Sequence, residues 1–330
     1  MRARATREGR KVHVVPRLSI GLPVCNGEKY LAASLDSLLG QTYDHFELII
    51  SDNASSDRTA EICATYARRD PRIRYFRQPR NIGCAPNHNF VTAKATGELF
   101  KVASDDDVYA PDLLERCVQA LDDHPGVVLA HSWSAVIDEM GVVTCLVDYP
   151  VATDAARAPE RFRSMLFDGW ADDEGGVVRM DVLRRSGAHA SYHFADRTFT
   201  AELALYGPFY MVPDRLFFRR EHPGQGGALK TVRARCVNLD PRRGNRLLHP
   251  VARLYAEYVL GYVAAIRRAP LSPEDRTECY RTLAKWVAGR TVPVFRATFS
   301  NDGRVLQREE HHGRVSLPDV LSAFERVADE

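Results

Sequence analysis

Short apolar runs alternate with segments of helical periodicity over the first hundred residues, and few folds accommodate such an order. The predicted strands occupy residues 17–24, 46–51, 73–76 and 99–103. Helices are predicted between them at 29–39, 57–69 and 87–95. A chain that alternates in this way forms a parallel sheet with helices packed on its faces. We therefore expect an α/β fold with a mostly parallel, Rossmann-like central sheet flanked by helices.

The rest of the chain predicts a more mixed order and a change of character near residue 240. Helices are predicted at 111–122 and 202–206, and strands at 127–132, 209–212 and 216–219. After residue 240 the apolar residues recur at helical spacing, which predicts a C-terminal helical extension over 241–330. At the other end, residues 1–15 are expected to form a basic, disordered leader.

Charge and cysteine content argue against several classes of protein. The 45 Lys and Arg nearly balance the 43 Asp and Glu, so the net charge of +2 does not favour a nucleic-acid partner. The seven cysteines include no C-x-x-C pair, which indicates reduced thiols and a cytoplasmic location. No run approaches the roughly 18 apolar residues of a membrane span.

Two properties of the assembled protein stay open at this point. Arg253, Arg267 and Arg268 flank an aromatic stripe of Tyr255, Tyr258 and Tyr262. The stripe predicts packing of a C-terminal helix onto the main domain, while the arginines allow a weak peripheral contact at the inner membrane face. The oligomeric state is undetermined, with a homodimer as one option.

The loop after the first predicted strand lacks the glycines of common phosphate-binding motifs. Residues 22–30 read L-P-V-C-N-G-E-K-Y, whereas a dinucleotide fold needs G-x-G-x-x-G and a phosphate-loop NTPase needs G-x-x-x-x-G-K-[ST]. Neither H-E-x-x-H nor G-x-S-x-G occurs in the chain. These observations argue against a nicotinamide enzyme, a phosphate-loop NTPase and the hydrolases that carry the last two motifs.

Carboxylate and amide side chains instead follow the predicted strands. They are Asn26, Glu28, Asp52, Asn53, Asp105, Asp106 and Asp107. Ligands of an open parallel sheet bind beyond the carboxyl ends of its strands, so we expect these groups to converge on one crevice. Such side chains can accept hydrogen bonds from a nucleotide base and ribose. Adjacent carboxylates can also hold a Mg²⁺ or Mn²⁺ ion that neutralises a diphosphate.

Four motifs in this order resemble the N-terminal half of family 2 glycosyltransferases. Residues 23–31, 51–57, 80–83 and 104–107 read P-V-C-N-G-E-K-Y-L, S-D-N-A-S-S-D, R-N-I-G and S-D-D-D. The resemblance covers roughly residues 17–225 and implies the GT-A fold. Within that fold, residues 16–110 would form the nucleotide-sugar-binding half and 111–240 the acceptor-binding half of one domain.

The resemblance also implies an activity. A hexosyltransferase of this kind moves a sugar from a UDP- or dTDP-sugar to an acceptor hydroxyl with inversion, in glycan or natural-product biosynthesis. It implies dependence on Mn²⁺ or Mg²⁺ as cofactor. The identity of the hydroxyl acceptor is not implied.

The resemblance assigns residues to the donor nucleotide. Those implied to line the nucleotide pocket are Pro23, Val24, Asn26 and Glu28. Asp52 would accept a hydrogen bond from the base, with Asn53 beside it. Arg80 and Asn81 would border the uridine or thymidine.

The acidic turn resembles the D-x-D motif of the family, except that Ser104 stands where many relatives have the first Asp. Asp106 is then the implied metal ligand, Asp105 the ribose contact and Asp107 a reserve metal ligand. Residues 220–222 resemble the family's R-x-H turn. That likeness makes Arg220 a candidate for the phosphate side and His222 a candidate for the phosphate or the metal.

Asp196 matches the position of the general base in inverting members of the family. Ala195 replaces the Glu that many relatives carry before this Asp. A carboxylate at this position would take the proton of the acceptor hydroxyl as its oxygen attacks the sugar.

Structural interpretations and other functions compete with these assignments. The acidic turn could be a solvated loop, and Asp196 could be an ordinary helix N-cap. Ser104 and Ala195 keep open a catalytically inactive nucleotide-sugar-binding protein. A nucleotidyltransferase is a further alternative, although it would need a Gly-rich, basic loop after the first strand.

Overall fold

The structure is a computed structural model that describes most of the chain. The described residues are 15–147, 149–168, 175–225, 229, 231–299 and 315–316. The prediction of a disordered leader falls on residues 1–15, of which all but residue 15 lie outside the described part. The same holds for the C-terminal extension beyond residue 299, apart from 315–316.

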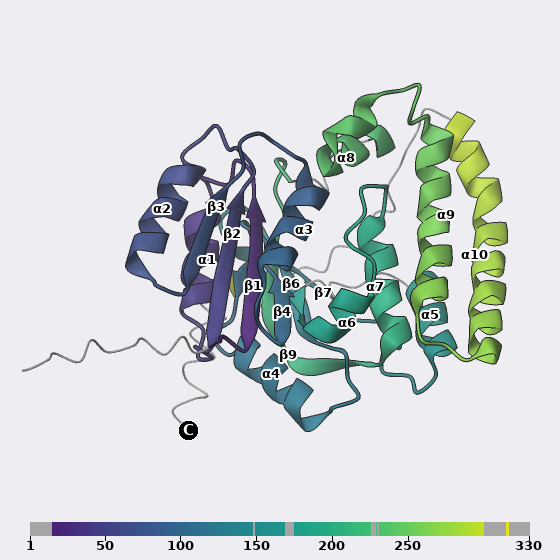
Figure 1. Cartoon of the computed structure of the whole chain (residues 1–330), viewed down its shortest axis with the longest axis horizontal. Helices are drawn as coiled ribbons and strands as arrows, with labels where there is room; N and C mark the ends of the chain where they lie inside the picture. The colour runs from purple at the N-terminus through teal and green to yellow at the C-terminus, as the bar shows by residue number, and fades with distance from the viewer. Residues whose placement is uncertain are drawn as a thin grey trace, which may run out of the picture.

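The first half of the chain forms the parallel part of the central sheet (Figure 1). Its strands are β1 (Leu18–Val24), β2 (Phe46–Asp52), β3 (Ile73–Arg77) and β4 (Leu99–Val102). They lie in the order β3-β2-β1-β4, and each neighbouring pair is parallel. The carboxyl ends of these strands therefore share one edge of the sheet.

Helices cover both faces of this part of the sheet. They are α1 (Leu31–Leu39), α2 (Thr59–Arg69) and α3 (Cys84–Lys94). Figure 1 shows α1 and α2 on one face and α3 on the other. Side chains of β2 alternate accordingly, because Leu48 packs in the core cluster that contains Leu35 of α1, whereas Ile49 packs in the cluster that contains Val91 of α3.

The second half extends the sheet with antiparallel as well as parallel pairs. Its elements are β5 (Val108–Tyr109), α4 (Leu113–Asp123), β6 (Leu129–Ile137), β7 (Val142–Val147), α5 (Ala158–Phe167), β8 (Val177–Arg179), α6 (Met180–Arg185), α7 (Ala195–Tyr206) and β9 (Phe209–Arg220). β8 joins the halves, since it pairs antiparallel with both β4 and β6. β9 runs parallel to β6 and antiparallel to β5. The predicted α/β architecture is confirmed.

The two strands predicted at 209–212 and 216–219 are one strand, β9. Ser132 of β6 pairs with Val212, but the next residue, Trp133, pairs with Arg215, so Pro213 and Asp214 bulge out of the ladder. Proline has no amide hydrogen to donate to a neighbouring strand, which explains an irregularity at this point. The sequence pattern correctly placed an interruption near residues 213–215, but it did not predict that the strand continues beyond it.

The C-terminal extension is helical as predicted and packs against the second half. It contains α8 (Val232–Leu239), the 3₁₀ turn η3 (Pro241–Gly244), α9 (Val251–Arg268) and α10 (Pro273–Phe299), and residues Val315–Ser316 add strand β10 to β7. In Figure 1, α9 and α10 lie side by side next to α5 and α7. Tyr258 and Tyr262 of the predicted aromatic stripe are buried against Trp286 of α10 and Phe162 of α5. Among the described helices, none is both long and apolar enough to cross a membrane.

An ion pair between Glu202 of α7 and Arg268 of α9 helps to hold the extension in place. The Arg268 guanidinium donates two hydrogen bonds to the carboxylate, at 2.8 and 2.7 Å. The Glu202 side chain is 4% exposed and also accepts the amide of Gly187, whereas the Arg268 side chain is 43% exposed. Loss of the arginine would remove two hydrogen bonds and the positive charge from a buried carboxylate.

We expect Arg268→Met to lower the free energy of unfolding by about 2 kcal/mol, because it leaves the Glu202 carboxylate buried without its cation. Chemical denaturation measures this change. Arg267→Met is the matched control, since Arg267 is the exposed neighbour on the same helix. Equal stability of the two variants would contradict a stabilising role for the pair.

Candidate active site

The loops that follow β1 and β2 are joined by hydrogen bonds at the carboxyl edge of the sheet. The Asn26 amide donates to Ser55 Oγ at 2.9 Å, and the Ser56 amide donates back to Asn26 Oδ1 at 2.8 Å. Asn26 and Ala54 both adopt positive φ, at 56° and 59°. A left-handed conformation at a non-glycine residue is uncommon, and here it turns each loop toward the other. Asn26 is thus placed at the edge where it was predicted.

Glu28 lies in the loop after β1, and its side chain is held against the residue that precedes α2. Its Oε2 accepts the Arg58 amide at 2.9 Å, and its own amide donates to Asp57 Oδ2 at 3.1 Å. Burial alone would raise the pKa of Asp57, but hydrogen bonds from Thr59 and from the Glu28 amide hold it below its ordinary value. The predicted nucleotide contact at Glu28 would come from a carboxylate that already accepts the amide of Arg58, the residue before α2.

Asp52 is fully buried at the end of β2. Its Oδ1 accepts the Ser55 amide at 2.8 Å, and its Oδ2 accepts the Tyr75 hydroxyl at 3.1 Å. Arg77 Nε lies 3.4 Å from Oδ2. A nucleotide base that forms the predicted hydrogen bond to Asp52 would have to share the carboxylate with these partners or displace one of them.

The third predicted motif lies against the second. Asn53 Nδ2 donates to Asn81 Oδ1 at 3.1 Å, and the Ile82 amide donates to Asn53 Oδ1 at 2.8 Å. Arg80 is exposed beside them. Of the β1 residues assigned to the pocket, Pro23 is half-buried, whereas the Val24 side chain is 2% exposed and packs in the core.

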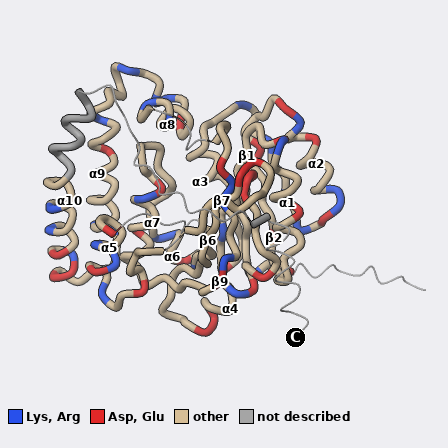
Figure 2. The backbone as a smooth tube through the Cα atoms, turned by 180° about the vertical axis from the view of Figure 1, so that it is seen from behind, with Lys and Arg blue, Asp and Glu red and all other residues tan. Residues whose placement is uncertain are grey.

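The acidic turn after β4 meets the loop after β1. Asp105 lies so close to Gly27 that its carboxylate occupies the space where a Cβ atom would stand. Burial, together with the neighbouring Asp106 carboxylate, raises the pKa of Asp105 to about 7. Figure 2 shows a group of acidic residues next to the label of β1. The polar groups after β1, β2 and β4 do converge, as the sequence predicts.

Asp106 and His222 form a close pair at this edge. Asp106 Oδ2 lies 3.0 Å from His222 Nε2, and its Oδ1 accepts the Ser104 hydroxyl. The two side chains are 17% and 15% exposed. The ring of Tyr30 packs on the His222 imidazole with centroids 4.8 Å apart, which restricts where the imidazole can point.

Asp107 and Arg220 tie the acidic turn to the end of β9. Asp107 Oδ1 accepts the Arg220 amide at 2.9 Å, and Arg220 Nε donates to the Asp106 carbonyl at 2.9 Å. The guanidinium also donates to the Asp138 carbonyl and lies over the Tyr30 ring. Arg220 is therefore engaged by protein groups and positions the turn, while its predicted contact with phosphate stays a prediction.

Asp106 and His222 could bind a divalent cation although they are only two ligands. In the described part of the chain, no group of three or more His, Cys, Asp or Glu side chains could hold a metal ion. Mg²⁺, however, is usually held by one or two carboxylates together with phosphate oxygens and water, and Mn²⁺ accepts similar oxygen ligands. Asp106 and His222 could supply the protein's share, whereas Asp107 faces the Arg220 amide.

Asp196 lies in the first turn of α7, next to Phe194, which adopts a left-handed φ of 60°. The alternative that Asp196 is the N-cap is wrong, because Phe194 occupies that position and no side chain caps the helix. A carboxylate in the first turn is nevertheless favourable at a helix N-terminus. The Asp196 charge acts on His189, whose pKa is lowered by burial and partly restored by this carboxylate. None of the contacts seen among the described residues joins Asp196 to Asp106 or His222.

Sequence reasoning missed Tyr30, which carries both the His222 and the Arg220 contacts. It also missed Ser55 and Ser56 as the groups that link two loops. All three residues lie inside the quoted motifs. Their aromatic and hydroxyl side chains, adjacent to predicted site residues, could have indicated a role in the site.

We expect Gly27→Ala to lower the free energy of unfolding by about 1 to 3 kcal/mol, because the added methyl group collides with the Asp105 carboxylate and with Val24. Chemical denaturation measures the loss. Gly126→Ala is the control, since a Cβ there meets no atom within 4 Å. A loss at Gly27 no larger than at Gly126 would show that Asp105 is not confined against the loop.

Comparisons with known proteins agree with this geometry. The sequence model of glycosyl transferase family 2 matches residues 19–142. The chain is 35% identical over 128 residues to an uncharacterized glycosyltransferase of Haemophilus influenzae, which covers 38% of this chain and 50% of that protein. It is 31% identical over 102 residues to glycosyltransferase GlyG of Streptococcus pneumoniae, covering 31% of this chain and 34% of that protein. The chain thus spans half or less of the length of these relatives.

A solved structure extends the likeness over most of the chain. Residues 1–349 of S. aureus TarS, determined in complex with UDP-GlcNAc, superpose with a TM-score of 0.53 over 91% of this chain and 98% of that one, at 15% identity. At this identity the likeness concerns the fold, and it confirms the expected GT-A type architecture. The family match itself is confined to residues 19–142, and the structural likeness extends the fold over most of the chain.

Proposed function

We propose that the protein transfers a sugar from a nucleotide-diphosphate sugar to an acceptor hydroxyl, with inversion at the anomeric carbon. The observation that carries this proposal is the placement of Asp106 and His222, 3.0 Å apart, at the edge where the loops after β1, β2 and β4 meet. That arrangement can bind a cation and the diphosphate that the cation bridges.

The donor is proposed to be a UDP- or dTDP-sugar. The likeness to TarS supports this choice, since that protein was determined in complex with UDP and with UDP-GlcNAc. Asn53, Asn81 and the exposed Arg80 form a polar rim at the end of β2 and β3 that can border a pyrimidine base. Asp105, which lies against Gly27, is the proposed ribose contact.

The cofactor is proposed to be Mn²⁺ or Mg²⁺, held by Asp106 and His222. Such a cation would stabilise the negative charge that develops on the leaving nucleotide diphosphate. Tyr30 and Arg220 keep the two ligands in place, because Tyr30 packs on the imidazole and Arg220 binds the Asp106 carbonyl. Asp107 holds the Arg220 amide and so acts on the same turn.

Asp196 is proposed to be the general base. Its carboxylate would take the proton of the acceptor hydroxyl while the acceptor oxygen forms a bond to the anomeric carbon. The bond from that carbon to the phosphate oxygen breaks, and its electron pair stays on the nucleotide diphosphate. Attack from the face opposite the leaving group gives inversion without a covalent enzyme intermediate.

The setting of the reaction also stays a proposal. We also propose a cytoplasmic location, from cysteine usage, and a weak peripheral contact at the inner membrane face through Arg267, since Arg253 and Arg268 are paired with Glu257 and Glu202. The proposed acceptor is a hydroxyl compound.

We expect Asp106→Asn and His222→Gln each to weaken Mn²⁺-dependent binding of UDP at least about tenfold, because each removes a proposed ligand of the cation. Calorimetric titration of UDP with and without Mn²⁺ measures the effect. Asp181→Asn is the control, since that carboxylate lies on α6 with its side chain 69% exposed. Full Mn²⁺ dependence in both site variants would rule out this pair as the metal site.

We expect Asp196→Asn to leave the affinity for UDP and Mn²⁺ unchanged and to slow hydrolysis of the donor sugar by about a hundredfold or more. Water takes the place of the acceptor in this assay, which is run with a panel of UDP- and dTDP-sugars. A variant that hydrolyses the donor as fast as the parent protein would exclude Asp196 as the base. A parallel loss of UDP binding would indicate a role in the donor site instead.

A further inference from the structure

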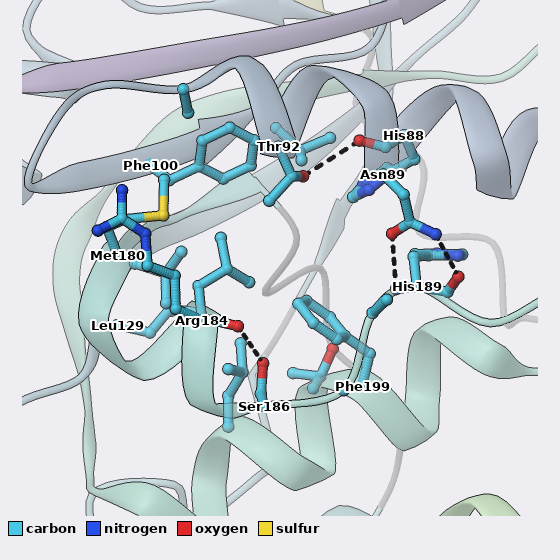
Figure 3. A pocket seen from close by; sticks show the side chains of 18 of the residues that line it. His88, Asn89, Thr92, Phe100, Leu129, Met180, Arg184, Ser186, His189 and Phe199 are labelled. Carbon is cyan, nitrogen blue, oxygen red and sulfur yellow. Dashed lines mark hydrogen bonds between the residues drawn. The ribbon is translucent and has the colours of Figure 1, made fainter.

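A cavity of about 330 Å³ lies between α3, the sheet and the helices α6 and α7 (Figure 3). Most of its wall is apolar, with Phe100 and Val102 of β4, Met180 of α6 and Leu203 of α7 among the lining residues. The cavity is partly open to the surface. A volume of this size falls within the range of small-molecule sites, and such sites combine an apolar wall with a few placed polar groups.

The polar groups of the cavity gather at one end. His88 and Asn89 of α3 face His189, and the two imidazole rings have centroids 4.6 Å apart. Asn89 fixes the backbone at His189. Its side chain donates to the His189 carbonyl and accepts the His189 amide, both at 2.9 Å. His88 Nδ1 is buried and has no hydrogen-bond partner among the described residues. A buried nitrogen without a partner is costly, and because His88 lines the cavity its imidazole is the group that a ligand could bond.

This polar end lies near the edge of the sheet that carries the candidate site. α3 begins at Cys84, shortly after the carboxyl end of β3, so His88 in its second turn lies close to that edge. On the opposite wall, Phe199 and Thr200 of α7 line the cavity. Asp196 precedes them by three and four residues, and residues at these spacings share one face of a helix. Asp196 therefore stands one turn beyond the cavity, toward the start of α7.

We propose that this cavity binds the apolar body of the acceptor, a hydroxyl compound with a compact aromatic or alicyclic skeleton, and that His88 bonds to its polar group. The identification of the ligand as an acceptor rests on the proposed function, but binding to the cavity can be measured without turnover. A sugar acceptor would leave most of the apolar wall in contact with hydroxyl groups that the wall cannot satisfy. A flat apolar skeleton fills the same space at no such cost.

The first test uses 2-naphthol as an apolar probe and myo-inositol as a polar one, in calorimetric titrations of the full chain. The protein is expected to bind 2-naphthol at least about tenfold more tightly than myo-inositol. Leu203→Phe, which fills the cavity, is expected to weaken 2-naphthol binding by about tenfold or more. Leu146→Phe is the matched control, because Leu146 lies on β7, is 56% exposed and does not line the cavity.

The second test replaces the His88 imidazole by an apolar ring of similar size. His88→Phe retains a planar ring, so it is expected to bind naphthalene as the parent does but to lose about fivefold in affinity for 2-naphthol. UDP binding with Mn²⁺ is measured on the same samples. Absence of 2-naphthol binding beside normal UDP binding overturns the cavity inference alone, as does equal binding of myo-inositol. Absence of UDP binding beside normal 2-naphthol binding overturns the proposed function and leaves the cavity as an apolar site.

Discussion

The bond from the Arg220 amide to the Asp107 carboxylate holds the two halves of the candidate site together. It joins residues 113 positions apart, the end of β9 and the turn after β4. The guanidinium of Arg220 strengthens the link through the Asp106 carbonyl. Because of this link, His222 comes to lie 3.0 Å from Asp106, and a strand end from the second half completes a site begun by the first. A buried hydrogen bond to a carboxylate is also among the stronger contacts that a loop can make.

The remaining polar groups at this edge differ in how far they are already engaged. Asp52 and Glu28 bind amides and hydroxyls of the protein itself, so they stiffen the loops that would surround a nucleotide. Asp105 lies close to Asp106, and burial together with repulsion between the two carboxylates accounts for the raised pKa of Asp105. The edge therefore divides into a rigid frame made by β1 and β2 and an acidic turn that a positive charge would complement.

The sequence predicted those parts of the site that follow from the periodicity of apolar residues and from the order of the strands. Asn26, Asp52 and Asp105 could be placed together because parallel strands end at one edge, and the structure brings them there. The partners of these residues depend on side-chain contacts that no period encodes, such as the packing of Tyr30 on His222. Continuity of β9 across Pro213 was hidden because a proline normally interrupts a strand. The cavity beneath α3 could not be predicted, since it depends on the spacing of α3 from α7 and not on either sequence alone.

Hydrogen–deuterium exchange of the full chain, with and without UDP and Mn²⁺, tests most directly whether loops from separate strands form one nucleotide site. The account predicts that the ligand protects residues 25–28, 53–57, 104–107 and 220–222 together, with no protection when UDP or Mn²⁺ is omitted. Protection of one of these loops without the others, or of none of them while UDP still binds, would contradict a shared site at the carboxyl edge of the sheet.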